Sequence, residues 1–180
     1  MKLSFRLPFV FCALALVAAC ASPKVELPTL AEVDIDPARQ AMAIREVALL
    51  RSQGKRAWCV PFARNLSGIE IRGNANTWWG QAEGIYERGH TPRVGSVMAF
   101  SKSSRLSMGH VAVVSEVLTD RHILIDHANW SRNKVSLKMG VIDVSDAGDW
   151  SRVKVESNPG AYGSVYPVSG FIHPKTHNAI

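Results

Sequence analysis

The pattern of apolar and polar positions changes from helical to strand-like near the middle of the chain. Asp36 followed by Pro37 is typical of a helix start, with the aspartate as N-cap and the proline at the first helical position. Apolar residues then recur at helical spacing: Ala41, Ile44, Ala48 and Leu49. This pattern predicts a helix that packs on the core and ends at Gly54. A short second helix is expected over residues 59–66.

The second half of the chain contains short apolar runs that are typical of strands. Five segments fit this pattern: residues 95–100, 110–118, 122–128, 153–155 and 165–172. The glycine-rich and asparagine-rich stretch 68–95 is expected to form loops. Because helices come first and strands follow, the order predicts an α+β fold with N-terminal helices packed on an antiparallel sheet.

The first twenty residues resemble a bacterial export signal. Lys2 and Arg6 precede an apolar run over residues 7–17, which is too short to span a bilayer comfortably. Small residues then lead to Cys20, as in a lipobox, where this cysteine becomes the lipidated first residue. Ordinary A-x-A cleavage, which would remove Cys20, is the alternative. The lipobox predicts an exported periplasmic lipoprotein of the cell envelope, anchored to a membrane through a lipid on Cys20.

Composition and charge exclude several classes of protein. The 180 residues are 47% hydrophobic, which excludes collagen-like, wholly disordered and coiled-coil chains. The formal charge is +6, and without Lys2 and Arg6 the remaining 19 basic and 15 acidic residues leave +4. Because no dense block of Lys or Arg stands out, we expect no nucleic-acid partner. A mildly positive surface suits a polyanionic polymer of the envelope.

The cysteines point to one reactive thiol. Of the three cysteines, Cys12 lies in the leader and Cys20 is lipidated or removed, so Cys59 is the thiol left in the folded domain. It opens the second predicted helix, where unpaired N–H groups and the helix dipole are expected to lower its pKa and favour the thiolate. A buried structural cysteine is the alternative.

A nucleophilic cysteine needs a histidine to hold the proton, and His110 is the best placed of the six histidines. It follows a glycine and begins an apolar strand, so it is expected to face a cleft. A two-residue turn at 119–120 or at 120–121 pairs even residues of this strand with odd residues of the next. With the 119–120 turn, His110, His127 and Asn129 share one face.

Five blocks of sequence, taken in order, resemble the CHAP domain, the cysteine, histidine-dependent amidohydrolase/peptidase family. The blocks are residues 58–64 (WCVPFAR), 73–79 (GNANTWW), 92–100 (PRVGSVMAF), 109–114 (GHVAVV) and 127–130 (HANW). The resemblance covers about residues 55–174. It implies a papain-like fold, as in the NlpC/P60 proteins, with Cys59 as nucleophile and His110 as general base. It also implies that Trp78 and Trp79 shape the domain or its cleft, although plain core packing explains them equally well.

The third catalytic group departs from the family. Many CHAP domains have Glu-x-Asn-Trp in the last block, and here His127 stands in the Glu position while Asn129 is kept. A neutral histidine nitrogen or an amide oxygen can accept a hydrogen bond from the catalytic imidazole and fix its tautomer. We therefore expect His127 to orient His110, with Asn129 second. Asp126 is third, because only an odd-length loop would bring it to this face.

The resemblance leads to a division of the chain and a function. We expect a signal peptide with lipobox over 1–20, a tether over 21–36, a CHAP-like cysteine amidase/peptidase domain over 37–175 and a tail over 176–180. Some family members carry an acidic calcium loop before the cysteine, and residues 50–57 contain no acid, so no metal or other cofactor is expected.

The expected function is a peptidoglycan hydrolase that cuts an amide bond, either N-acetylmuramoyl-L-alanine or a stem-peptide link. A catalytically silent peptidoglycan-binding lipoprotein is the alternative. The leader argues against a glutathionylspermidine-type amidase, because its substrate would be cytoplasmic. The sequence names no regulatory protein partner.

The lipobox yields a first prediction. Cys20→Ser should release or mis-process the protein, because the thiol that carries the lipid is gone. Fractionation of membranes and soluble extract checks this, with globomycin-treated cells as the control. If globomycin caused no build-up of precursor, ordinary A-x-A cleavage would be the correct reading.

Overall fold

The computed structural model describes residues 35–175. Four predicted features lie outside the described residues: the signal peptide, the lipidation site Cys20, most of the tether and the C-terminal tail. The first helix, α1 (Pro37–Ser52), begins as predicted, because the Asp36 carboxylate accepts the N–H of Ala38 at 2.8 Å and Pro37 occupies the first turn. It ends at Ser52, slightly before the predicted Gly54.

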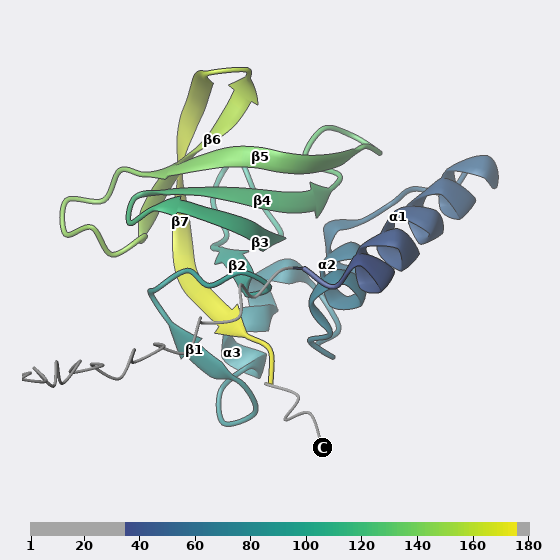
Figure 1. The fold of residues 1–180 in the computed structure, drawn as a ribbon, viewed down its shortest axis with the longest axis horizontal. Coiled ribbons are helices and arrows are strands. Elements are labelled where there is room, and N and C mark those ends of the chain that lie inside the picture. The colour runs from purple at the N-terminus through teal and green to yellow at the C-terminus, as the bar shows by residue number, and fades with distance from the viewer. Residues whose placement is uncertain (1–34, 176–180) are drawn as a thin grey trace, which may run out of the picture. The chain divides into compact units, whose positions relative to one another are not determined.

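The predicted buried face of α1 is wrong. The four apolar residues expected to pack on the core are all exposed: Ala41, Ile44, Ala48 and Leu49. Ala43 and Val47 are buried instead. Helix α1 packs along a narrow stripe against α2 (Cys59–Ser67), which lies between α1 and the strands (Figure 1). A stripe this narrow needs only small residues one turn apart, so most apolar residues of α1 remain outside it.

Helix α2 connects the helices to the sheet. It has a strong amphipathic pattern and buries Phe62, Ala63 and Leu66. These residues join strand residues in one apolar cluster, and α2 contacts β3 and β4 directly. The helix ends at Gly68, whose φ of 74° is the left-handed conformation that closes helices. The nine residues of α2 therefore hold Cys59 at a fixed position beside the sheet.

Within residues 35–175, seven strands and two short helical turns follow α2. Their bounds are η1 (Ala75–Thr77), α3 (Trp78–Gln81), β1 (Glu87–Gly89), β2 (Val97–Phe100), β3 (His110–Thr119), β4 (His122–Ala128), β5 (Val135–Asp143), β6 (Arg152–Asn158) and β7 (Ala161–His173). All five predicted strands are present. The turns η1 and α3 and the strand β1 lie where loops were expected, and β5 was not predicted, because its outer half carries polar and exposed residues.

The strands form one antiparallel sheet that closes on itself. The order is β1-β7-β2-β3-β4-β5-β6, and β7 also pairs with β6. Strand β7, yellow in Figure 1, is long enough to pair with β6 through its first half and with β2 and β1 through its second half. Strands β2 to β7 therefore form a barrel-like ring. The α+β class and the antiparallel sheet are confirmed, whereas the closure was not foreseen.

The closed sheet separates two apolar cores. One lies on the helix side and includes Phe62, Trp78, Val111 and Val113. The other lies inside the ring and includes Phe100, Ala112, Val114, Ile125 and Trp150. Because side chains alternate along a strand, even-numbered residues at the start of β3 point into the ring. His110 begins this series at the ring's end.

The hairpin of β3 and β4 has the turn of one predicted alternative and, after two bulges, the strand register of the other. Thr119 pairs with His122, so the turn is Asp120-Arg121. Two bulges then each add one residue to β3, and the ladder ends with Val114 opposite Ile125 and Val113 opposite Asp126. This final register is the one predicted for the 119–120 turn. Two extra residues restore the parity, so the predicted faces of His110 and His127 are kept.

Candidate active site

Cys59 lies at the first position of α2, half-buried. Trp58, the N-cap residue, makes no side-chain capping bond, so the N–H groups of the first turn remain free to face the sulfur. Burial raises the pKa of the Cys59 thiol above its usual value. Hydrogen bonds from the backbone N–H groups of Val111, Cys59 and Val60 lower this pKa, but by less than burial raises it. The expected low thiol pKa is therefore corrected, and the resting thiol is neutral.

Gly109 brings a loop against the start of β3. Its φ is 67°, and a Cβ there would lie 2.8 Å from both Asn76 N and Phe100 O, which backbone atoms cannot accommodate. The close approach is secured by the bond from Asn76 N to Met108 O at 2.9 Å. Glycine is therefore required next to His110, and the segment around Asn76 forms one wall of the site.

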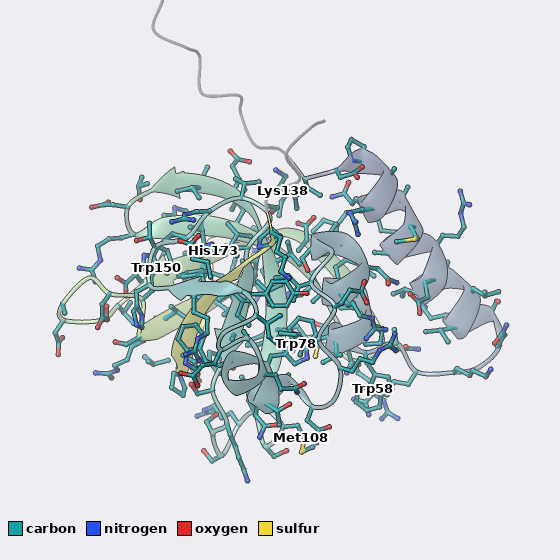
Figure 2. All side chains as sticks on the ribbon, turned by 90° about the horizontal axis from the view of Figure 1, so that it is seen from below. Trp58, Trp78, Met108, Lys138, Trp150 and His173 are labelled. Atoms are coloured by element: carbon teal, nitrogen blue, oxygen red, sulfur yellow. The ribbon has the colours of Figure 1, made fainter. Side chains whose placement is uncertain are left out.

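Cys59 and His110 line one cavity of about 640 Å³. The other residues lining it are Trp58, Val60, Pro61, Gly73, Asn74, Ala75, Arg105, Leu106, Ser107, Met108, Gly109 and Asn129. Figure 2 shows Trp58 and Met108 at the same border of the structure, and the side chains of both are exposed. The lining contributed by residues 35–175 includes Arg105 and no Asp or Glu, so the cavity favours anionic groups.

Among residues 35–175, His110 makes one side-chain hydrogen bond, and its partner lies inside the closed sheet. Its Nε2 lies 3.0 Å from Nδ1 of His127, and the two rings meet edge to face at 5.1 Å. Trp130 stacks on the His127 ring at 5.5 Å and contacts His110 edge-on. Because Nε2 is occupied, Nδ1 is the nitrogen of His110 left for the cavity. Among the described residues, no hydrogen bond joins His110 to the Cys59 sulfur.

Both histidines are neutral at neutral pH. Burial lowers the pKa of His110 well below its usual value, and the nearby His127 adds a smaller effect in the same direction. Burial also lowers the pKa of His127, to about 3. A proton on either ring would have to be held without a counter-charge inside the apolar ring. The pair is therefore suited to accept a proton only while a negative charge develops beside it.

Asp126 faces away from the histidines, as the hairpin parity predicts. Its carboxylate is fully buried on the helix side, where Oδ2 accepts Gln40 Nε2 at 2.9 Å and Oδ1 accepts Lys138 N at 2.8 Å. Asn129 has left the strand, with φ of 65°. Its Oδ1 accepts Asn133 N at 2.9 Å and Arg56 Nε at 3.3 Å. The structure thus brings His110 and His127 together and leaves Asn129 on the cavity wall.

Sequence reasoning missed two features near the site. Arg56 lies over the ring of Trp58 at 4.2 Å and joins this exposed indole to Asn129 at the cavity border. Met139 of the unpredicted strand β5 contacts His127 from the side opposite His110. The predicted aromatic pair has a structural role, because Trp78 is fully buried in the helix-side core and Trp79 packs closely over Gly170.

The described part of the chain contains neither a cluster of metal ligands nor a membrane-spanning helix. Within residues 35–175, no group of three His, Cys, Asp or Glu side chains is placed to hold a metal ion. No helix in that range is long and apolar enough to cross a membrane.

A family model matches the segment that contains this site. The model of the CHAP domain covers residues 51–129, from the last turn of α1 to the end of the β3–β4 hairpin. This segment is a CHAP domain. No curated protein matches the chain. The CHAP domain implies a papain-like fold and supports a hydrolase of the amidase or peptidase type that acts on peptidoglycan. Cys59, His110, His127 and Asn129 all lie within the matched segment.

Four variants compared in one assay test which group orients His110. His127→Ala should lower kcat far more than it raises KM, by up to about 10⁴-fold as in the serine triad, because orientation acts mainly in the transition state. His127→Glu should restore part of the rate by supplying an acceptor. Asn129→Ala should cost less, and Asp126→Asn should change kcat little, because its bonds lie on the other face.

Two outcomes of this comparison would contradict the assignment of His127 as the orienting group. A large loss for Asn129→Ala alone would assign the role to the asparagine. A large loss for Asp126→Asn with little for His127→Ala would contradict the hairpin register described above.

The pH dependence provides a separate prediction for the CHAP domain. His110 must be neutral to accept a proton, and burial lowers its pKa, so the rate should be lost only as the pH falls well below 6.5. Initial rates on suspended peptidoglycan, measured between pH 4 and 9, check this. A half-maximal rate at or above pH 6.5 would show that His110 is not the buried base described here.

Proposed function

We propose that this CHAP domain is a cysteine-dependent peptidoglycan hydrolase that cleaves either the N-acetylmuramoyl-L-alanine amide or a stem-peptide bond. The observation that carries the proposal is that Cys59 and His110 line one cavity while His127 supports His110 from behind. A nucleophile, a base and an orienting group in this order are the parts that amide cleavage by cysteine requires.

The reaction begins with a neutral pair. As the sulfur of Cys59 attacks the scissile carbonyl carbon, its proton passes to His110 Nδ1, and the C–S bond forms. The carbonyl oxygen becomes an oxyanion, and the backbone N–H groups at the free start of α2, beginning with that of Cys59, stabilise it. The expected hydrogen bond from His110 to His127 holds the imidazole while it carries the positive charge.

The second half of the reaction returns the proton. When the C–N bond breaks, His110 donates its proton to the leaving amine, and the acyl group remains on Cys59 as a thioester. Water then attacks the thioester with His110 again as base, which releases the carboxylic acid and restores the thiol.

The basic residues of the cavity wall favour a substrate that carries carboxylate groups. Arg105 lines the cavity, and the Arg56 guanidinium lies at its border, held between the Trp58 ring and Asn129. Stem peptides carry carboxylate groups, which a guanidinium binds in a bidentate manner. The exposed indole of Trp58 offers an apolar surface beside the nucleophile for the rest of the substrate.

The location of the protein is part of the same proposal. Residues 1–20 supply the pattern of an export signal with a lipobox, so Cys20 is the proposed lipid attachment site. A lipid anchor would hold the domain at a membrane of the periplasm, next to its polymer. The peptidoglycan and the membrane are then its two partners, joined through the stretch 21–36.

One observation favours the alternative of a silent peptidoglycan-binding lipoprotein. The thiol pKa is raised and the His110 pKa is lowered, so the two groups do not form an ion pair at rest. A catalytic site must then transfer the proton during attack, whereas a binding module needs no transfer. The two functions therefore differ in the reactivity of Cys59.

Replacing Cys59 distinguishes the hydrolase from the silent binding lipoprotein. Cys59→Ala should abolish release of fragments from purified sacculi, because the proposed acyl intermediate forms on the Cys59 sulfur, while thermal unfolding stays near that of the unchanged protein. Mass spectrometry of the products identifies the bond that is cut.

Two outcomes would contradict the hydrolase. Equal digestion by the unchanged protein and by Cys59→Ala would remove the cysteine mechanism. Binding to sacculi without digestion, together with alkylation of Cys59 no faster than that of a free thiol, would support the binding lipoprotein.

A further inference from the structure

We propose that Met139 is a positioning residue that sets the tautomers of His127 and His110, so that His110 presents a bare nitrogen to Cys59. The proposal rests on the proposed cysteine mechanism for its consequence in catalysis. Its physical content, the location of two protons, can be tested without any substrate.

Met139 contacts His127 at the nitrogen that does not face His110. His127 Nε2 lies 3.2 Å from the sulfur of Met139. A thioether sulfur has lone pairs and no hydrogen, so it can only accept. The proton of this contact must therefore be on His127 Nε2. Because burial keeps His127 neutral, this ring has one N–H, and its Nδ1 is bare.

The hydrogen bond between His127 and His110 then fixes which nitrogen of His110 carries its proton. Nδ1 of His127 lies 3.0 Å from Nε2 of His110, and a bare Nδ1 can only accept. His110 must then donate from Nε2. Its own Nδ1 is left bare on the side of the cavity that Cys59 also lines. A bare Nδ1 is what a general base for the Cys59 thiol needs.

A bulge in β5 brings Met139 into this position. Ile125 pairs with Met139 but His127 pairs with Ser136, so β5 has one residue more than β4 between these pairs. Lys138 occupies the bulge with φ of 53°. Its N–H, which is free of the ladder, donates to Asp126 Oδ1 at 2.8 Å. Asp126 thus holds the bulge from the opposite face of the sheet.

Position 139 is less buried than the two histidines. Met139 is half-buried and lines a separate cavity of about 330 Å³ between β5 and β6, together with Glu156. None of the residues that line this cavity lines the Cys59 cavity. The ammonium of a lysine at position 139 would lie between His127 Nε2 and this cavity, so it can donate one N–H to the ring and the others to water.

The chemistry predicts opposite results for an acceptor and a donor at this position. A donor next to His127 Nε2 requires that nitrogen to be bare, which moves the His127 proton to Nδ1. His127 then donates to His110 Nε2, and His110 must carry its proton on Nδ1. In this reversed arrangement His110 cannot accept the proton of Cys59.

The experiment compares Met139→Lys, which supplies a donor, with Met139→Leu, which removes the acceptor at similar volume. Leu137→Lys is the matched control, because it adds the same charge at an exposed position of the same strand. Nitrogen NMR of the full chain with ¹⁵N-labelled histidine gives the protonated nitrogen of each ring. The rate at which iodoacetamide alkylates Cys59, followed by mass spectrometry of its peptide, reports the base.

The unchanged protein should carry protons on Nε2 of both rings. Met139→Lys should move both to Nδ1 and lower the hydrolysis of sacculi by about 10²- to 10⁴-fold, the range seen when a triad histidine takes the wrong tautomer. It should also slow the alkylation of Cys59. Met139→Leu should lose about 2- to 10-fold, the effect of one hydrogen bond, and Leu137→Lys should match the unchanged protein.

Two results would overturn the proposal. One is a proton on Nδ1 of His127 in the unchanged protein, which needs no variant to fold. The other is a Met139→Lys protein in which His110 keeps its Nε2 proton. If the tautomers behave as expected but sacculi are not digested, the hydrolase proposal fails while the assignment of Met139 stands.

Discussion

The hydrogen bond between His110 and His127 connects the parts of this structure that matter for chemistry. It joins the first residue of β3 to a residue near the end of β4, across a hairpin whose two bulges cancel in parity. Both rings are buried at one end of a closed sheet, and Trp130 covers them. Because water is excluded, each ring has few partners, so the direction of one hydrogen bond fixes the direction of the next.

The same burial decides the state of the nucleophile. Three backbone N–H groups face the Cys59 sulfur and favour the thiolate, two from Cys59 and Val60 at the start of α2 and one from Val111 in β3. Burial acts in the other direction and is the larger effect, as it is for both imidazoles. Cys59 and His110 therefore do not form an ion pair at rest. The site keeps its groups neutral until a substrate carbonyl receives the charge, and the free N–H groups are then available for the oxyanion.

The accuracy of the sequence predictions followed the range of the interactions involved. The start of α1 was predicted correctly because Asp36 and Pro37 act within one turn. The face of α1 was wrong because burial there depends on how narrowly α2 meets it. The turn between β3 and β4 is one of the two that the sequence left open, and the predicted faces of His110 and His127 were right, because two bulges add an even number of residues.

The sequence alone was sufficient for the α+β class, for Cys59 at the start of a helix and for the placement of His110 and His127 on one face, since these depend on residue order and on the two-residue period of strands. Only the tertiary structure decided the closure of the sheet, the neutral state of Cys59 and the contact of Met139 with His127. The closure requires β7 to pair with both β2 and β6, which are far apart in the chain. Burial and the β5 bulge arise from that packing, and no local pattern of residues encodes them.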